Sequence, residues 1–193
     1  MQELKDRIVK EGKILPGNIV KVDGFLNHRV DCAFMGRIAD EFQKFFDLDK
    51  VDLILTAEAS GIALSAICAY RYGKPMVYAK KAKSDNIEGG LYQSEIFSYT
   101  YKKKVTLLVS KEWLSASDKV LIIDDFLANG CALLGLIDIV KHAGAKIAGA
   151  GIVIEKGCQK GGELVRSQGI RVESLAIIDE MDPVKGCKFR DDD

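Results

Sequence analysis

The chain has 193 residues, a mass of 21.2 kDa and a formal net charge of zero, from 28 basic and 28 acidic side chains. Apolar residues make up 48% and charged residues 29%, which is globular composition and excludes a collagen, a coiled coil and a disordered chain. A chain of this length buries roughly 70% of its unfolded surface, so a single domain needs no disulfide or metal for stability. The neutral charge does not favour a protein that binds nucleic acid or membrane surfaces.

The cysteines and histidines indicate neither a disulfide framework nor a zinc site. Five cysteines are an odd number, and no two of them have the spacing C-x-x-C. His28 and His142 have no thiol or carboxylate nearby at the spacing of metal ligands. Lys5, Asp6 and Arg7 interrupt any early apolar run, so we expect no signal peptide, and no later run reaches the length of a membrane span. We therefore expect a cytoplasmic protein with reduced thiols.

In the first half of the chain, hydrophobic residues alternate between helical spacing and short continuous runs. The expected elements are a helix with Leu4, Ile8 and Val9 on its apolar face and Gly12 at its end, a strand at 19–22, a helix capped by Asp31, a buried strand at 51–55, a loop at 56–61, a helix at 62–72 that Gly73 ends, and a strand at 76–79.

The second half begins with a charged, glycine-containing loop at 80–90. The expected elements after it are a hairpin from strands at 96–101 and 105–109 with lysines at its tip, a buried strand at 120–123 that ends at Asp124 and Asp125, a helix at 132–143, strands at 145–154 and 172–178 with a polar helix at 162–168 between them, and a loose tail after Pro183. Short strands alternating with helices predict a mostly parallel sheet with helices on both faces, whose ligands bind beyond the carboxyl ends of the strands.

The segment VLIIDDFLANGCA at 120–132 is the most informative in the chain. Backbone N–H groups at a helix N-terminus favour a phosphate, and Gly130 allows close approach to it. Asp124 and Asp125 would repel that phosphate if they faced it, but they can accept hydrogen bonds from hydroxyls. The segment therefore suits a ribose 5-phosphate. The alternatives are aspartates that only cap the turn, or the acidic strand of a P-loop nucleotidase, whose G-x-x-x-x-G-K-[ST] loop the chain lacks.

VLIIDDFLANG resembles the signature of the type I phosphoribosyltransferases, which bind 5-phosphoribosyl 1-diphosphate, and most closely that of the branch that uses xanthine. ILTAEASGIA at 54–63 and AGAGIVIEK at 148–156 extend the resemblance in the same order over nearly the whole chain, to about residue 180. The resemblance implies an α/β fold with a mostly parallel sheet flanked by helices, a small hood from the chain ends and a flexible hairpin loop. It implies one domain over 1–193, with the hood at about 1–30 and 156–193 and the core at about 31–155.

The resemblance also implies the residues of the site. Asp124, Asp125 and Lys81 are the expected catalytic residues, with the two aspartates on the ribose hydroxyls. The other expected contacts are Ala128, Asn129, Gly130, Cys131 and Ala132 on the 5-phosphate, Glu58, Ala59, Ser60 and Gly61 on the diphosphate, Lys83 and Ser84 in a closing loop at 80–92, and Val20, Asn27 and Lys156 on the base. Magnesium is the expected cofactor, bound through the diphosphate, with Asp124 and Asp125 as candidate ligands.

The resemblance places Lys156 against position 6 of the base. The base is expected to be a 6-oxopurine, because the Lys156 ammonium cannot accept a hydrogen bond from the amino group of adenine. Asn27 can donate its amide to the second oxo group of xanthine. The plainer alternatives are an exposed strand-end lysine at 156 and a turn-capping asparagine at 27, and the aromatic residue that stacks on the base is left open between Phe126 and the tyrosines. Cys131 and Val20 depart from the family pattern, in which glutamine and leucine are common.

We therefore expect transfer of the phosphoribosyl group to xanthine, giving xanthosine 5′-monophosphate and diphosphate. A guanine or hypoxanthine phosphoribosyltransferase is an alternative, as is a non-catalytic regulatory protein that senses 5-phosphoribosyl 1-diphosphate and binds nucleic acid. The resemblance implies a homodimer, with the hairpin tip and the segment after Gly61 as candidate interface pieces, and no nucleic-acid or membrane partner.

Overall fold

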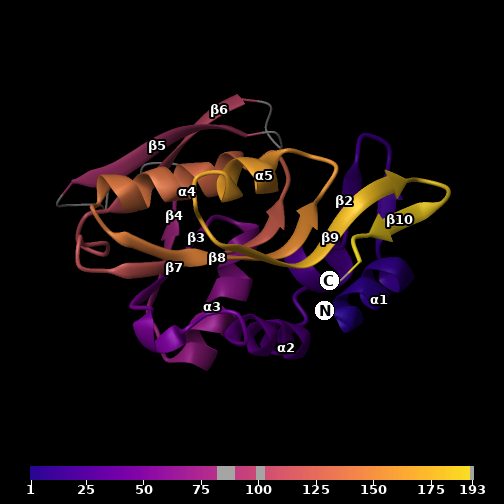
Figure 1. Cartoon of the computed structure of the whole chain (residues 1–193), viewed down its shortest axis with the longest axis horizontal. Coiled ribbons are helices and arrows are strands. Elements are labelled where there is room, and N and C mark those ends of the chain that lie inside the picture. Colours follow the sequence, from indigo (N-terminus) through magenta and orange to yellow (C-terminus); the bar gives the residue numbers. More distant parts are fainter. Residues whose placement is uncertain (82–89, 99–102, 192–193) are drawn as a thin grey trace.

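The computed structural model describes residues 1–81, 90–98 and 103–191 (Figure 1). The helices are α1 (Gln2–Glu11), α2 (Cys32–Gln43), α3 (Ser60–Tyr72), α4 (Cys131–His142) and α5 (Gly161–Arg166), with the short helical turns η1 (Asp23–Asn27) and η2 (Leu48–Lys50). The strands are β1 (Lys13–Leu15), β2 (Ile19–Lys21), β3 (Leu53–Ala57), β4 (Met76–Ala79), β5 (Leu91–Ser98), β6 (Lys103–Ser110), β7 (Lys119–Leu127), β8 (Lys146–Lys156), β9 (Val172–Asp182) and β10 (Gly186–Phe189).

The main sheet has six strands in the order β10-β9-β8-β7-β3-β4. All neighbouring pairs are parallel except β10 with β9, which confirms the expected mostly parallel sheet. Helices α4 and α5 cover one face and α2 and α3 cover the other (Figure 1). The antiparallel hairpin β5–β6 lies over α4, and Gly135 makes room for it there, because a Cβ at this position would lie 2.5 Å from the side chain of Ile96.

The central strands are buried on both faces, and this explains their continuous apolar runs. Leu53 and Leu55 pack into the core under α4, whereas Ile54 between them packs into the core formed with α2 and α3. The same alternation continues in β7, where Ile122 and Ile123 point to opposite cores. Successive side chains of a strand point to opposite faces, so a parallel strand covered on both sides needs an apolar residue at every position.

Two helix boundaries have the local causes that the sequence predicts. Asp31 is the N-cap of α2, and its carboxylate accepts a hydrogen bond from the backbone N–H of Phe34 at 3.0 Å. Gly73 ends α3 in the left-handed conformation, with a φ of 63°, which a side chain would disfavour. The predictions of a capped second helix and of a glycine stop are confirmed.

Several boundaries differ from the predictions. The side chain of Val9 is 67% exposed, so the apolar face of α1 consists of Leu4 and Ile8 without it. Helix α3 begins at Ser60 and contains Gly61, which shortens the loop expected at 56–61. Strand β1, which pairs with β2, was not expected.

One strand is longer than expected, and another was not expected. Strand β7 continues through Asp124 and Asp125 to Leu127, because its parallel pairing with β8 continues that far. The polar tail after Pro183 is not loose, since β10 pairs with β9 in antiparallel register. The predicted hairpin is shifted, since β5 covers Leu91–Ser98 and Lys103 and Lys104, expected at the tip, lie in β6. Lys102 lies outside the described residues.

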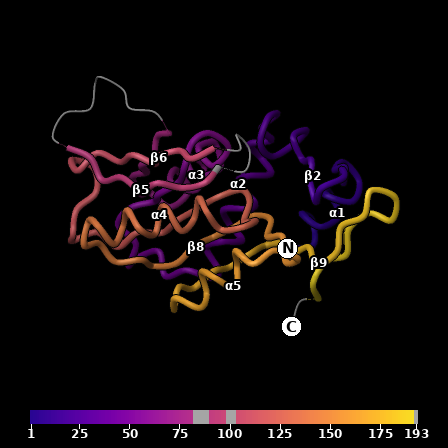
Figure 2. The backbone as a smooth tube through the Cα atoms, turned by 90° about the horizontal axis from the view of Figure 1, so that it is seen from above, coloured from indigo at the N-terminus to yellow at the C-terminus, as the bar shows by residue number. Residues whose placement is uncertain are grey.

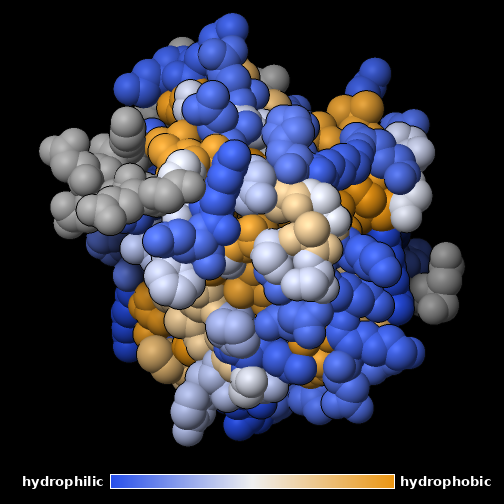
Figure 3. All heavy atoms as spheres, turned by 90° about the vertical axis from the view of Figure 1, so that its left-hand side faces the viewer, coloured by the Kyte–Doolittle hydropathy of each residue, from blue (hydrophilic) through white to orange (hydrophobic). Residues whose placement is uncertain are grey.

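Both termini lie at one end of the molecule, beside α1, β9 and β10 (Figures 1 and 2). The terminal ammonium of Met1 donates to the backbone oxygen of Leu175 at 2.8 Å, which ties the start of the chain to β9. The opposite end carries the hairpin β5–β6, and its surface is mainly hydrophilic with separate hydrophobic patches (Figure 3). Within the described ranges, no helix is both long and apolar enough to cross a membrane.

Candidate active site

A cavity of about 390 Å³ lies at the carboxyl ends of β3, β7 and β8, where the topology predicts a ligand site. Its lining joins the segment before α2 to these strands and comprises Val20, Asn27, Ala57, Glu58, Ser60, Lys81, Asp124, Asp125, Phe126, Ala128, Ala132 and Lys156. A smaller cavity of about 180 Å³ shares part of this lining and adds Asn129, Gly130 and Cys131. The structure thus brings together most of the residues predicted from the sequence.

A larger cavity of about 660 Å³ lies at the open edge of the sheet, beside β4 and Trp113. None of the predicted site residues is in its lining. The smaller cavities combine a helix N-terminus, paired carboxylates and two lysines, and this convergence of polar groups distinguishes a reactive site better than volume does.

The phosphate-binding loop, which we define as residues 128–132, leads into α4. Gly130 is the N-cap of α4 and has a φ of 82°, which favours glycine. The first N–H groups of a helix have no partner inside the helix and, with the helix dipole, form an anion site. Residues 128–132 therefore have the backbone geometry that a phosphate needs.

Backbone atoms of α5 support the phosphate-binding loop. The N–H of Gly161 donates to the backbone oxygen of Ala128 at 3.1 Å. A Cβ on Gly161 would lie 2.2 Å from that oxygen and 2.5 Å from the nitrogen of Gly130. Only glycine permits this contact. Sequence reasoning missed Gly161, and the Gly161–Gly162 pair at the start of a helix was the signal that could have revealed it.

The two aspartates lie side by side in β7, and both are almost fully buried, with exposures of 7% for Asp124 and 5% for Asp125. One oxygen of Asp124 accepts a hydrogen bond from the backbone N–H of Asp125 at 3.0 Å. Asp125 accepts from the amide of Asn27 at 3.2 Å and from the hydroxyl of Ser60 at 3.0 Å. Asp125 therefore links the base side of the cavity to the start of α3.

Burial raises the pKa of Asp124 well above its ordinary range, and the neighbouring charge of Asp125 adds to this shift. The raised pKa favours the neutral form of Asp124. With Asp124 neutral, the pair would place less negative charge beside a phosphate than two ionised carboxylates would.

The expected diphosphate loop begins at Glu58, and the peptide bond between Glu58 and Ala59 is cis. The Glu58 carboxylate accepts a hydrogen bond from the backbone N–H of Lys81, so this loop is joined to the segment after β4. Gly61 packs against Thr56 and Asp124, because a Cβ there would lie 2.1 Å from Oγ1 of Thr56 and 2.9 Å from Oδ1 of Asp124. Gly61 and Ala59 are not part of the cavity lining.

Of the residues predicted after β4, Lys81 lies in the cavity lining, whereas Lys83 and Ser84 lie outside the described residues. Thr56, which was not predicted, has a buried hydroxyl without a hydrogen-bond partner in the described part of the chain. This hydroxyl is next to the space that a Cβ at Gly61 would fill.

The residues predicted to contact the base, Val20, Asn27 and Lys156, all lie in the cavity lining. The ammonium of Lys156 donates to the backbone oxygen of Asn18 at 2.8 Å and lies 5.8 Å from the centre of the Phe126 ring. Burial lowers the pKa of Lys156. Phe126 is the aromatic residue in the lining, and Val20 supplies an apolar wall, with 7% of its surface exposed.

The oxygen ligands of the cavity suit magnesium only together with a substrate. Asp124 and Asp125 supply carboxylates, the donor type that Mg²⁺ prefers. In residues 1–81, 90–98 and 103–191, no group of three acidic, histidine or cysteine side chains is placed to hold a metal alone. Magnesium is usually held by one or two carboxylates together with substrate phosphates. The donor set fits a metal that arrives with a diphosphate.

Comparison with known proteins gives consistent results. The phosphoribosyl transferase domain model matches residues 33–170. The chain is 53% identical over its full length, and the full length of the relative, to a xanthine phosphoribosyltransferase of Lachnoclostridium phytofermentans. It is 50% identical over 96% of its length to xanthine phosphoribosyltransferase 1 of Clostridium perfringens, and covers 98% of that protein.

Solved structures share the fold. A Giardia lamblia APRTase, complexed with 9-deazaadenine, superposes with a TM-score of 0.73 at 25% identity, over 90% of this chain and 96% of that one. The adenine phosphoribosyltransferase of Saccharomyces cerevisiae gives the same TM-score at 18% identity, over 91% and 99%. The expected fold is therefore confirmed, and the chain belongs to the phosphoribosyltransferase family, in which the two relatives above, matched over nearly their full length, are xanthine phosphoribosyltransferases.

Proposed function

We propose that the chain transfers the 5-phosphoribosyl group from 5-phosphoribosyl 1-diphosphate to xanthine, forming xanthosine 5′-monophosphate and diphosphate. The observation that carries the proposal is the convergence, around two adjoining cavities, of the phosphate-binding loop, the buried aspartates, Lys81 and Lys156. The full-length relatives named for xanthine support the choice of base.

The proposed substrate position follows from the polarity of the cavity walls. The 5-phosphate lies on the backbone N–H groups of residues 128–132, at the positive end of α4. The ribose hydroxyls donate to Asp124 and Asp125. The diphosphate then faces Ser60 and Lys81, on the same side as Glu58. This order leaves the base between Asn27, Lys156 and Phe126.

The chemical step is cleavage of the bond between the sugar C1 and the diphosphate oxygen, with positive charge developing on the sugar. The base nitrogen forms the new bond to C1 and loses its proton to solvent, and the diphosphate leaves with the electron pair of the broken C1–O bond. The protein contributes by holding both reactants in line and by stabilising the leaving group, and no covalent intermediate on a side chain is required. Magnesium, when bound with the diphosphate, neutralises part of its charge.

Recognition of the base is assigned to hydrogen-bond donors. The Lys156 ammonium offers donors only, which suits the 6-oxo group and disfavours the amino group of adenine. The Asn27 amide suits the second oxo group of xanthine. The ring of Phe126 provides an apolar surface for stacking.

The direct test is nucleotide formation in the presence of magnesium and 5-phosphoribosyl 1-diphosphate, with xanthine, guanine, hypoxanthine and adenine supplied in turn. We expect kcat/KM to be highest for xanthine and lowest for adenine. Preference for guanine or hypoxanthine would contradict the assignment of xanthine as the base but would still support phosphoribosyl transfer. No product with any base, combined with binding of 5-phosphoribosyl 1-diphosphate, would instead support the regulatory alternative.

We also propose that the chain acts as a homodimer in the cytoplasm, with its ends as a hood over a core at about 31–155. The family resemblance supports the dimer and the hood, and five free cysteines suit a reducing compartment. Sedimentation equilibrium should give a mass about twice 21.2 kDa. A mass of one chain at micromolar concentration would contradict the dimer.

A further inference from the structure

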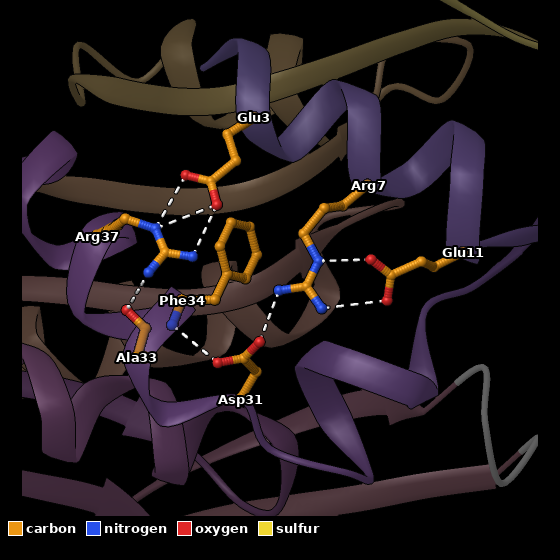
Figure 4. A network of polar contacts seen from close by, with 7 residues as sticks. All are labelled: Glu3, Arg7, Glu11, Asp31, Ala33, Phe34 and Arg37. Carbon is orange, nitrogen blue, oxygen red and sulfur yellow. Dashed lines mark hydrogen bonds and ion pairs between the residues drawn. The ribbon is translucent and has the colours of Figure 1, made fainter.

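A network of ion pairs surrounds Arg7, on α1 (Figure 4), and none of the residues drawn there belongs to the cavity lining. The Arg7 guanidinium bonds to both carboxylate oxygens of Glu11, at 2.9 and 3.1 Å, and to Oδ2 of Asp31 at 2.8 Å. The centre of this group also lies 4.5 Å from the centres of the Phe25 and Phe34 rings. Only 19% of the Arg7 side chain is exposed, which is little for a charged residue.

Arg7 contacts both ends of one segment, residues 25–31. Phe25 begins the stretch 25–31 and is fully buried, while Asp31 closes it as the N-cap of α2. The backbone N–H of Asp31 donates to the oxygen of Phe25 at 3.3 Å, so the two ends also meet directly. A single planar guanidinium thus contacts the ring at one end of the segment and the carboxylate at the other.

The segment 25–31 carries one of the base-side residues. Asn27 lies two residues after Phe25, in η1, and its amide reaches into the cavity to donate to Asp125 at 3.2 Å. The side chains of Arg29 and Val30 in this segment are exposed, so they do not fix its position by packing. Backbone hydrogen bonds of η1 also hold the segment, among them the one from the N–H of Arg29 to the oxygen of Asp23 at 2.8 Å. Beyond these, the position of Asn27 depends on Leu26, which is buried, and on the two ends that Arg7 joins.

We propose that Arg7 is a positioning residue that fixes Asn27 and thereby sets the discrimination between bases, an inference that rests on the proposed function. Arg7 does not touch substrate in this account. Its loss leaves the phosphate-binding loop, Asp124 and Lys156 unaltered, since none of them contacts the Arg7 network.

Arg37 provides a matched control from the same network. Its guanidinium binds Glu3 and the backbone oxygen of Ala33, and it lies 5.5 Å from the Phe34 ring (Figure 4). It has no hydrogen bond to segment 25–31. Substitution of Arg37 removes an arginine, an ion pair and a contact with Phe34 without releasing the segment that carries Asn27.

The experiment compares Arg7→Met with Arg37→Met in the full chain. We expect Arg7→Met to raise KM for xanthine roughly tenfold, the equivalent of about one hydrogen bond, and to lower the preference for xanthine over guanine. The KM for 5-phosphoribosyl 1-diphosphate should stay within about twofold of the wild-type value. Arg37→Met should change none of these constants. Equal effects of the two substitutions would overturn the proposal.

A second comparison separates positioning from general destabilisation. In an Asn27→Ala background, Arg7→Met should have little further effect on KM for the base, because the residue that it positions is gone. An additive effect would contradict the proposal. If Arg7→Met does not fold, Asp31→Asn serves instead, since asparagine keeps the N-cap and loses the ion pair with Arg7.

The proposal has a readout that does not depend on catalysis. Hydrogen exchange of the backbone amides of residues 23–31 should be faster in Arg7→Met than in Arg37→Met. Equal exchange in the two variants would reject the role of Arg7 whatever the activity. Absence of nucleotide formation by the wild-type chain would reject the proposed function, and the exchange result would still decide whether Arg7 holds the segment.

Discussion

The two parts of the cavity that we propose bind the phosphate and the base are built in different ways, and we call them the phosphate side and the base side. The phosphate-binding loop comes from one continuous segment, and backbone contacts with Gly161 hold it in place. The base side combines Asn27 and Lys156, which are far apart in the sequence. The Asn27 amide donates to the Asp125 carboxylate, and the Lys156 ammonium donates to the backbone oxygen of Asn18. A backbone site tolerates many side chains and recognises a group common to all substrates. A side-chain site can change its specificity through single substitutions.

The largest effect should come from the carboxylates that lie between the two sides. Replacing both Asp124 and Asp125 by asparagine should lower kcat about 10²–10³-fold with every base, the range seen when groups that stabilise a transition state are removed. Asp138→Asn is the control, because that carboxylate is exposed on α4. Steady-state kinetics check this, and unchanged turnover in the double variant would refute the assignment of the ribose site.

The next largest effect tests the backbone support of the phosphate-binding loop. Gly161→Ala should raise KM for 5-phosphoribosyl 1-diphosphate about 10–100-fold, because a Cβ there collides with backbone atoms that cannot turn aside. The ratio of kcat/KM between xanthine and guanine should not change. Gly36→Ala, in α2, has no atom near its new Cβ and is the control. A change in base preference with an unchanged KM for the diphosphate substrate would contradict the division between the two sides.

A substitution on the base side should change the preference between bases and leave the KM for 5-phosphoribosyl 1-diphosphate unchanged. Lys156→Gln should lower kcat/KM for 6-oxopurines about tenfold or more, because a charged hydrogen bond is lost. Adenine should lose less, since it presents no oxygen there. The KM for 5-phosphoribosyl 1-diphosphate should remain near the wild-type value in initial-rate measurements. An equal loss with adenine would remove Lys156 from base selection.

The smallest effect concerns stability and comes from Asp124. Its raised pKa means that the folded chain holds this proton more tightly than the unfolded chain, so stability falls as pH rises from about 4 through the raised value. Asp124→Asn removes this loss of stability at high pH, because asparagine does not titrate. Each unit by which the pKa is raised corresponds to about 1.4 kcal/mol of stability, or roughly 2–4 °C in Tm for a chain of this length. Melting curves should show the variant more stable at pH 7 and the difference shrinking towards pH 4. A constant difference would contradict the account.

The sequence predicts the sheet and the phosphate-binding loop well because both depend on local order. Buried parallel strands need continuous apolar runs, and the loop at 128–132 is contiguous, so neighbouring residues carry the signal. By contrast, the sequence does not reveal the contact of Gly161 with Ala128 or the bond from Lys156 to Asn18, because each joins segments that are distant in the chain. Strand β10 was missed because an edge strand on one side of a sheet can be polar.

The most direct test of the account is a crystal structure with xanthosine 5′-monophosphate and magnesium diphosphate bound. We predict that the 5-phosphate lies on the amides of residues 128–132, the ribose hydroxyls at Asp124 and Asp125, and the base between Asn27 and Lys156. A nucleotide bound in the cavity of about 660 Å³ beside β4, or bound with its base towards α4, would contradict it.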